Sequence, residues 1–247
     1  MGRVALVSGG GRGIGRACAL GLAEDGFDVA VNYRRDDDAA AQTVAAIEAL
    51  GRKAKSYRAS VESAAEDEAM VAAVLADFGS IDTFVHSAGI ASRGHTVADT
   101  DPAELERVIA IHALGGHHLC RLVLPSMRTQ PRGDVVLVSS VAARILAPNS
   151  APYNMAKAAL EALAMTLAKE ERRHGIHVNV VAPGLVVTEM GRRLMRAMGV
   201  DDISTMDANA AFGRVCRPED VAGVVRFLCS EQAGYLTGQV IAVDGGG

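Results

Sequence analysis

The chain contains 247 residues, carries a formal net charge of −4 and is 49% hydrophobic. Its basic residues are dispersed, so an acidic chain of this kind offers no electrostatic footprint for nucleic acid. The four cysteines are widely separated and form no Cys-x-x-Cys pair, which is typical of free thiols in the cytoplasm. His117 and His118 would point about 100° apart on a helix, so we expect no metal site.

The start of the chain and its apolar runs argue against export and membrane insertion. Met1 leads directly into the first apolar run, so we expect no signal peptide. No apolar run approaches the roughly 20 residues that a membrane span requires. We therefore predict a cytoplasmic protein with no membrane partner.

Short apolar runs alternate with helical patterns along the whole chain. The runs lie near residues 3–7, 28–32, 53–58, 81–86, 133–139, 176–181 and 239–243. This alternation is typical of an α/β protein whose parallel sheet is covered on both faces. Because no linker, long charge run or repeat interrupts the pattern, we predict a single domain over residues 1–247.

The first apolar run ends at a glycine-rich loop that leads into a helical pattern. Strand, glycine loop and helix in this order suit a pyrophosphate, because glycines let the backbone approach it and the helix N-terminus presents N–H donors. The strict G-x-G-x-x-G spacing is absent, and glycine stands instead at Gly9, Gly13 and Gly15. A glycine-rich turn without a ligand is the alternative, but cofactor binding is the interpretation we favour.

The end of the second run bears on the choice of cofactor. Dinucleotide folds that select NAD place a carboxylate here to bind the adenosine ribose. This chain has Arg34 and Arg35 at that point, and its first acid is Asp36. Arginine can clamp a 2′-phosphate through two parallel hydrogen bonds, and Arg12 in the glycine loop offers a second guanidinium. An ordinary exposed turn is the alternative; we predict NADP in preference to NAD.

A tyrosine and a lysine four residues apart suggest acid–base chemistry. The reference pKa of tyrosine is about 10, and a lysine one helical turn away favours the phenolate. Tyr153 and Lys157 have this spacing, and Ser140 ends the run near 133–139, where its hydroxyl could hold a substrate oxygen. Tyr-x-x-x-Lys occurs by chance in many helices, so the pair gains weight only beside the glycine loop.

The loop Ser-Gly-x-x-x-Gly-x-Gly, with Ser140, Tyr153 and Lys157, resembles the short-chain dehydrogenase/reductase family. Further matches follow in order at 86–89, 179–184, Thr188 and 236–246. The resemblance runs end to end and is nearest to 3-oxoacyl-carrier-protein reductase-like members. It implies a doubly wound Rossmann fold with a seven-stranded parallel sheet, and an oxidoreductase that interconverts a ketone and a secondary alcohol with a nicotinamide cofactor.

The resemblance assigns roles to the site residues. Tyr153 would protonate the carbonyl oxygen, Lys157 would lower the tyrosine pKa and bind the nicotinamide ribose, and Ser140 would position the substrate oxygen. Ser60 stands where relatives carry an aspartate for the adenine amino group. The implied cofactor-binding residues are Gly9, Arg12, Gly13, Ile14, Gly15, Arg34, Ser60, Ala88, Gly89, Tyr153, Lys157, Pro183, Gly184 and Thr188.

Two departures from the family pattern stand near this site. His112 occupies the position of an asparagine that anchors a water leading to the lysine. A neutral imidazole could hold the same water, and it titrates near physiological pH; a histidine that is simply tolerated there is the equal alternative. His86 and Ser87 replace two asparagines, which suggests local repacking more than lost chemistry.

The substrate is expected to be apolar. By resemblance, residues 187–214 form a lid, and its methionines Met190, Met195, Met198 and Met206 suit an adaptable hydrophobic pocket or simply pack the lid on the body. Small and aliphatic residues between Ser140 and Tyr153 argue against a sugar. A β-ketoacyl thioester, a hydrophobic ketone or a polycyclic alcohol would fit, and Arg128 and Arg172 could meet an acidic carrier protein.

The family also implies a homotetramer, with a dimer as the next choice. Helices near 101–129 and 151–174 would pair across a two-fold axis. The first of them carries what looks like surplus apolar surface at Leu105, Val108, Leu119, Leu122 and Val123. An NADP(H)-binding sensor or scaffold with little turnover is the alternative function, although such a protein has no physical need for Ser140, Tyr153 and Lys157.

Overall fold

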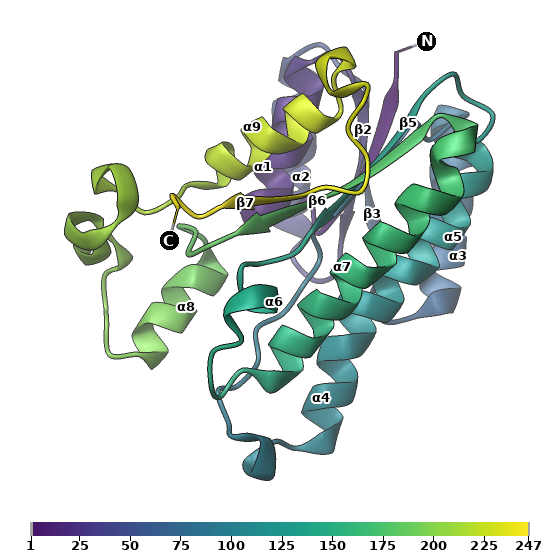
Figure 1. Ribbon diagram of the computed structural model, residues 1–247. Coiled ribbons are helices and arrows are strands. Elements are labelled where there is room, and N and C mark those ends of the chain that lie inside the picture. The colour runs from purple at the N-terminus through teal and green to yellow at the C-terminus, as the bar shows by residue number, and fades with distance from the viewer. Residues whose placement is uncertain (1, 247) are drawn as a thin grey trace.

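The computed structural model describes residues 2–246, in which one parallel sheet has helices on both faces (Figure 1). The strands are β1 Val4–Ser8, β2 Asp28–Tyr33, β3 Ala54–Arg58, β4 Thr83–His86, β5 Gly133–Val138, β6 Ile176–Pro183 and β7 Val240–Val243. Their order is β3-β2-β1-β4-β5-β6-β7. The order runs outward from β1 in both directions, so the topological switch point lies between β1 and β4. The predicted seven-stranded, doubly wound Rossmann fold is confirmed.

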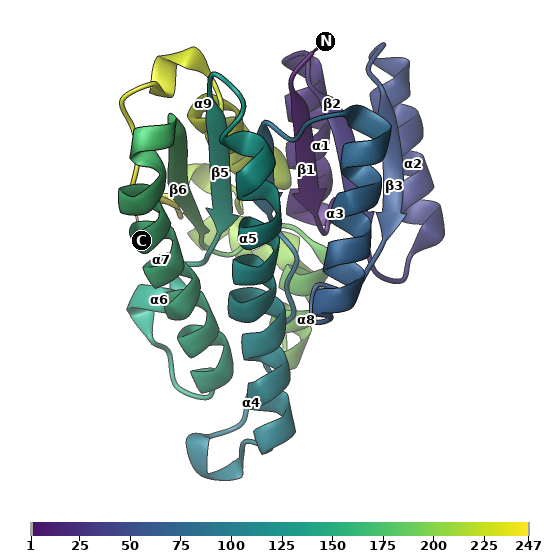
Figure 2. The ribbon, with the colours of Figure 1, turned by 90° about the vertical axis from the view of Figure 1, so that its right-hand side faces the viewer.

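Helices form a layer on each side of the sheet (Figure 2). One layer contains α1 Gly13–Glu24, α2 Asp37–Ala49 and α9 Pro218–Leu228; the other contains α3 Ala64–Phe78, α4 Pro102–Ile109, α5 Gly115–Met127 and α7 Ala151–Glu171. The shorter α6 Ala142–Ile145 and α8 Glu189–Ala197 lie beyond the carboxyl ends of the strands (Figure 1). Short 3-10 helices occupy Val97–Asp99, Arg172–His174, Ile203–Asn209, Ala211–Gly213 and Glu231–Ala233.

The central strands are apolar on both faces because each face meets a helix layer. Leu6 and Leu137 belong to the core shared with α3, α5 and α7, whereas Val7 and Val136 belong to the core shared with α1 and α9. All residues of β1 and β5 are buried. Strands buried on both faces read as nearly continuous apolar runs, which is why their positions could be predicted from the sequence.

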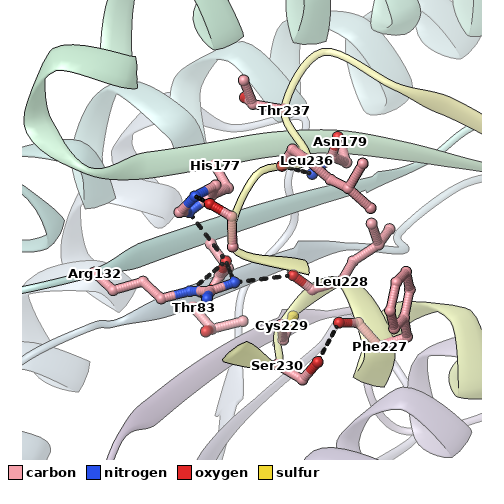
Figure 3. Close-up of polar contacts among 12 residues, drawn as sticks. Thr83, Arg132, His177, Asn179, Phe227, Leu228, Cys229, Ser230, Leu236 and Thr237 are labelled. Carbon is pink, nitrogen blue, oxygen red and sulfur yellow. Dashed lines mark hydrogen bonds and ion pairs between the residues drawn. The ribbon is translucent and has the colours of Figure 1, made fainter. Parts of the chain in front are cut away.

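Ion pairs fasten the edge of the sheet where the strands begin. Asp134 at the start of β5 is buried, and it pairs with Arg3 and with Arg132, whose Nη2 lies 2.9 Å from Oδ1. Arg132 also reaches the carbonyl of Leu228 in α9, and His177 at the start of β6 approaches the same carboxylate (Figure 3). The buried charge is therefore compensated by two guanidinium groups, as a buried carboxylate requires. We call this set, Arg3, Arg132, Asp134 and His177, the amino-edge network.

The segment Pro102–Met127 forms one long helix with a bulge. The regular α-helical stretches α4 and α5 are separated by the π turn η2, Ala110–Leu114. By length and composition this helix could cross a membrane, although charged residues such as Glu104, Arg107 and Arg121 interrupt its apolar run. Half of its most apolar stretch is nevertheless buried, and it packs in the layer between α3 and α7 (Figure 2). A core helix of a globular protein can have the same length and composition.

This helix leaves fewer apolar side chains exposed than the sequence suggested. Val108, Leu119 and Val123 are buried in the core, while Leu105 and Leu122 are partly exposed. The sheet and the neighbouring helices therefore use most of the apolar side chains.

The segment after β6 contains α8 and packs around a small cluster of its own. Met195, Ile203 and Val215 are buried there, with Met206 against them. Met190 and Met198, in contrast, are 37% and 68% exposed. The lid methionines thus divide: two pack the segment, and two face outward.

Candidate active site

The carboxyl edge of the sheet brings together the three residues predicted to do the chemistry. Ser140 lies two residues beyond the end of β5, while Tyr153 and Lys157 lie on the first turns of α7. The Lys157 Nζ is 5.6 Å from the centroid of the Tyr153 ring and donates to the carbonyl of Val138 at 2.7 Å. The Ser140 hydroxyl lies near Tyr153 and acts to lower its pKa. One strand end and one helix start therefore place a hydroxyl, a phenol and an amine side by side.

Short-range contacts hold this arrangement. The Ser140 Oγ accepts from the backbone N–H of Ala142 at 3.2 Å, which orients the serine as the chain turns into α6. The Asn154 side chain donates to the carbonyl of Ala147 at 3.0 Å and ties the intervening loop to α7. Pro152 in the first turn of α7 is favourable, because that turn does not use its N–H groups within the helix.

Burial sets the protonation of the two titratable groups. It lowers the pKa of Lys157 from 10.5 to about 7, an effect that Glu161 on the next turn partly offsets. Burial also raises the pKa of Tyr153, and the nearby Ser140 hydroxyl opposes that rise. The sequence-based expectation that the lysine brings the phenol into range is thus incomplete, since burial acts on both groups. At neutral pH the phenol holds its proton and can donate it.

His112 lies in the bulge of the long helix, next to the tyrosine. Its ring meets that of Tyr153 edge-on, with centroids 5.4 Å apart. The Nε2 lies 2.8 Å from the carbonyl oxygen of Ile90, and the Nδ1 is buried without a partner among the described residues. Burial holds the pKa of His112 well below its usual range. The expectation that this histidine titrates near physiological pH is therefore wrong: it is a neutral imidazole.

His86, which replaces a family asparagine, ties three elements together. Its Nδ1 meets the Ser8 hydroxyl at the end of β1 at 2.9 Å, and its Nε2 meets the carbonyl of His112 at 3.2 Å. Burial and the charge of Lys157 lower the pKa of His86 to about 4. These contacts agree with the interpretation that the change at this position repacks the strands.

The glycine loop has the backbone that a dinucleotide cradle requires. Gly9 and Gly13 adopt φ values of 66° and 55°, a left-handed region that favours glycine. A Cβ on Gly15 would lie 2.2 Å from the carbonyl oxygen of Gly9, and one on Gly9 would press on Ala88 at 3.0 Å. Arg12 is the N-cap residue of α1, but its side chain forms no capping hydrogen bond. The N–H groups of the first turn are therefore not used by the Arg12 side chain. This arrangement fits a pyrophosphate.

The adenosine end of the cradle contains an unpaired hydroxyl. The Ser60 Oγ, just beyond β3, is buried without a hydrogen-bond partner in the described part of the chain. Its backbone N–H donates to Glu66 at 2.8 Å. Because an unsatisfied buried hydroxyl is costly, the site fits a ligand group that bonds to it.

The arginines that were expected to bind a 2′-phosphate differ in their surroundings. Arg34 is half-buried and ion-paired with Glu62 at 3.7 Å, whereas Arg35 is exposed. Arg58, which pairs in register with Tyr33 at the end of β3, adds a further guanidinium at this edge. Neither Glu62 nor Arg58 was singled out from the sequence, since no motif marks them.

At the other end of the cradle, β6 reaches the loop. Its last residue, Pro183, accepts from the backbone N–H of Val141, and the N–H of Gly184 bonds to β7. The methyl group of Thr188 lies near Gly13, where an added Cβ would be 3.4 Å from it. The Thr188 hydroxyl caps α8 by accepting from the N–H of Gly191. Thr188 therefore joins the lid to the glycine loop, and Ile14 lies in the first turn of α1 beside it.

Known proteins resemble this chain along almost its whole length. Residues 9–247 match the family model described as enoyl-(acyl carrier protein) reductase. The chain is 37% identical to a 3-oxoacyl-[acyl-carrier-protein] reductase of Staphylococcus aureus, over 100% of this chain and 98% of the relative. The chain belongs to the short-chain dehydrogenase/reductase family. As a family member it is an oxidoreductase acting on CH–OH groups, with a nicotinamide cofactor.

Other relatives in the short-chain dehydrogenase/reductase family widen the range of substrates. The chain is 34% identical to an L-rhamnose 1-dehydrogenase (NAD(P)(+)) of a Sphingomonas species, with 99% of this chain and 96% of the relative covered. Its fold matches the crystal structure of a dehydrogenase/reductase from Sinorhizobium meliloti with a TM-score of 0.90 at 30% identity, over 99% of this chain and 94% of that one. The family is therefore firm, while its members differ in substrate.

Proposed function

We propose that this chain is an NADP(H)-dependent oxidoreductase that interconverts a ketone and a secondary alcohol, with Tyr153 as the acid and base. The observation that carries the proposal is the cluster of Ser140, Tyr153 and Lys157 at one strand end, beside the glycine loop. A nicotinamide cofactor supplies or accepts the hydride when it is bound.

The protein's own groups account for the rest of the reaction. Ser140, whose hydroxyl lies near the phenol, holds the ketone oxygen against it. Tyr153 donates its proton to that oxygen as negative charge develops there. Lys157, in its protonated form, stabilises the resulting phenolate, and its 2.7 Å bond to Val138 fixes the amine in place. Alcohol oxidation runs through the same groups in reverse.

His112 can support this centre as a neutral group. Its unpaired Nδ1 is buried next to the tyrosine, where a water could bridge it toward Lys157. Because its pKa lies well below the usual range, the relay would work without a change in its charge.

Preference for NADP is supported by the arginines at the adenosine end. Arg34 follows β2 where an acid would select NAD, and Arg12 precedes α1. The remaining contacts of the cofactor would come from Ser60, Ala88, Gly89 and Thr188, which lie around the glycine loop or follow the neighbouring strands.

An apolar substrate is supported by side chains near the catalytic residues. Ile145 and Leu146 in and after α6 are 62% and 61% exposed. Exposed aliphatic groups beside a reactive centre suit an acyl chain or a hydrophobic ketone better than a sugar. We propose a 3-oxoacyl thioester as the first substrate to test.

An acidic carrier protein as the partner that delivers the acyl group is less well supported. The Arg128 guanidinium makes two hydrogen bonds to the carboxylate of Glu171, at 2.9 and 2.5 Å. Glu171 thereby neutralises one of the two arginines that could meet an acidic carrier, while Arg172 stays exposed. A free acyl thioester is therefore the form of substrate that we favour.

The assembly and location that we propose follow the family. The chain would form one domain over residues 1–247 with a lid at about 187–214, act in the cytoplasm and assemble as a homotetramer. Leu114 and Met155, both more than half exposed on the α5 and α7 side, would lie in a helix-pairing interface. A monomeric mass in solution would contradict the tetramer.

Turnover with a panel of carbonyl compounds tests the proposed function. The protein is incubated with NADPH and with 3-oxoacyl thioesters, apolar ketones or a sugar lactone, and the nicotinamide absorbance is followed. We expect NADPH oxidation with the apolar carbonyls. Tight NADPH binding without oxidation across the panel would favour the sensor or scaffold instead.

A further inference from the structure

We propose that Glu62 is a specificity-determining residue for the cofactor. Its carboxylate holds Arg34 and competes with the 2′-phosphate of NADP for that guanidinium, and Arg107 weakens the competition by drawing the carboxylate away. This inference rests on the proposed preference for NADP.

The three side chains come from three elements that meet at the carboxyl edge. Arg34 follows β2, Glu62 follows β3, and Arg107 lies on α4. The Glu62 Oε1 is 3.7 Å from Nη1 of Arg34, and its Oε2 is 3.3 Å from Nε of Arg107. Each carboxylate oxygen thus serves a different arginine, and Glu62 stands two residues beyond the unpaired hydroxyl of Ser60.

The distances indicate that Glu62 forms a weak ion pair with Arg34 and a closer one with Arg107. A separation of 3.7 Å is an ion pair and lies beyond a good hydrogen bond, so the Arg34 guanidinium can turn toward another anion. A phosphate that joins it must approach the carboxylate of Glu62, and like charges at this range repel. The hydrogen bond from Arg107 reduces that repulsion by sharing the carboxylate's charge.

The two acids that follow Arg34 and Arg35 in the chain have partners of their own. Asp36 caps α2 by accepting from the N–H of Ala39, and Asp37 accepts from the Tyr33 hydroxyl at 2.6 Å. Within residues 2–246, Glu62 is the one carboxylate that forms an ion pair with Arg34. It is therefore the acid placed to set how readily Arg34 binds a phosphate.

Affinity for the two cofactors, measured by the change in cofactor fluorescence on binding, tests the proposal without relying on turnover. Glu62→Gln should tighten the dissociation constant for NADPH about threefold to fivefold and change that for NADH less than twofold, as expected for one exposed ion pair. Glu68→Gln is the matched control, because it removes an exposed glutamate that pairs with Arg121 at 2.9 Å on the same layer of helices. It should change neither constant.

A double-mutant cycle tests the part assigned to Arg107. Arg107→Gln leaves the carboxylate to Arg34 alone and should weaken NADPH binding about twofold. In the Glu62→Gln background the same change should have no effect, because the carboxylate is gone. An equal loss in both backgrounds would mean that Arg107 acts directly on the phosphate and would overturn this part.

The results separate this inference from the function on which it rests. If Arg34→Gln removes a preference for NADPH but Glu62→Gln acts no differently from Glu68→Gln, the role of Glu62 is wrong and the cofactor choice stands. If the unaltered protein binds NADH as tightly as NADPH, the proposed preference for NADP itself fails.

Discussion

The two edges of the sheet treat most of their buried polar groups in opposite ways. At the amino edge, the charge of Asp134 is compensated by Arg3 and Arg132. The nearby His177 Nδ1 lies 3.6 Å from that carboxylate and forms no hydrogen bond among the described residues. At the carboxyl edge, buried polar atoms lack partners among the described residues. These include the Ser60 Oγ, both carboxylate oxygens of Asp67, the Glu104 Oε2, the His112 Nδ1 and the Asn154 Oδ1.

The difference follows from what each edge does. Paired charges at the amino edge fasten strands and α9 to one another, and such pairs are strongly destabilising to break. Unpaired groups at the carboxyl edge cost stability, yet they leave donors and acceptors free for ligands. In open α/β sheets, ligands bind outside the carboxyl ends of the strands. The unpaired groups therefore lie where a ligand can bond to them.

Breaking the amino-edge network should give the largest change in stability. Asp134→Asn removes the buried charge on which Arg3 and Arg132 converge, and we expect a loss of about 3–5 kcal/mol in the free energy of unfolding. Denaturant titration measures this loss. The exposed Glu68→Gln should change stability by less than about 0.5 kcal/mol. An equally small change for Asp134→Asn would contradict the contrast between the edges.

Removing the amine at the carboxyl edge should impair activity instead. Lys157→Met should lower the rate of ketone reduction by roughly 10²–10³-fold, a loss typical of acid–base catalysis. Because the pKa of Lys157 is about 7, the wild-type rate should fall as pH rises through that value and the charge is lost. The variant should lack this limb in a pH–rate profile. A variant that keeps the limb would show that another group causes it.

Asp67 offers a way to make the carboxyl edge more stable. Burial and the neighbouring Glu66 raise the pKa of Asp67 from 3.8 to about 7. The folded state therefore holds the proton at pH values where the unfolded chain has lost it, and stability should fall as pH rises from about 4 to about 7. Asp67→Asn should raise the free energy of unfolding by about 1–3 kcal/mol above pH 7. Denaturant titration across this pH range checks the result, and an unchanged slope would exclude Asp67 as its source.

The smallest expected effect concerns the unpaired hydroxyl of Ser60. Ser60→Ala should leave stability unchanged or slightly higher, because the buried group has no partner to lose among the residues that the structure describes. It should weaken NADPH binding about twofold to tenfold if the hydroxyl bonds to the adenine. Equilibrium binding followed by fluorescence measures this change. Unaltered affinity would remove Ser60 from the cofactor site.

Much of the fold could be predicted from the sequence because each central strand is buried on both faces. The apolar runs near 133–139 and 176–181 correspond closely to β5 and β6. The glycine loop and the Tyr153–Lys157 pair could also be recognised in the sequence, because the spacing of residues within one element determines their geometry. These features depend on residues that are near one another in the chain.

What could not be predicted depends on contacts between distant segments. The ion pairs of Glu62 join residues from three elements, and no periodic pattern indicates them. The pKa of His112 was expected near neutrality because the sequence does not reveal that its ring is buried.

Single-turnover kinetics of Tyr153→Phe test the central claim most directly. With saturating NADPH and a 3-oxoacyl thioester, we expect the rate of ketone reduction to fall by about 10³-fold or more, because the phenol that protonates the oxygen is gone. The dissociation constant for NADPH should stay within about twofold of the wild-type value. A variant that reduces the ketone at the wild-type rate would contradict the assignment of Tyr153 as the acid.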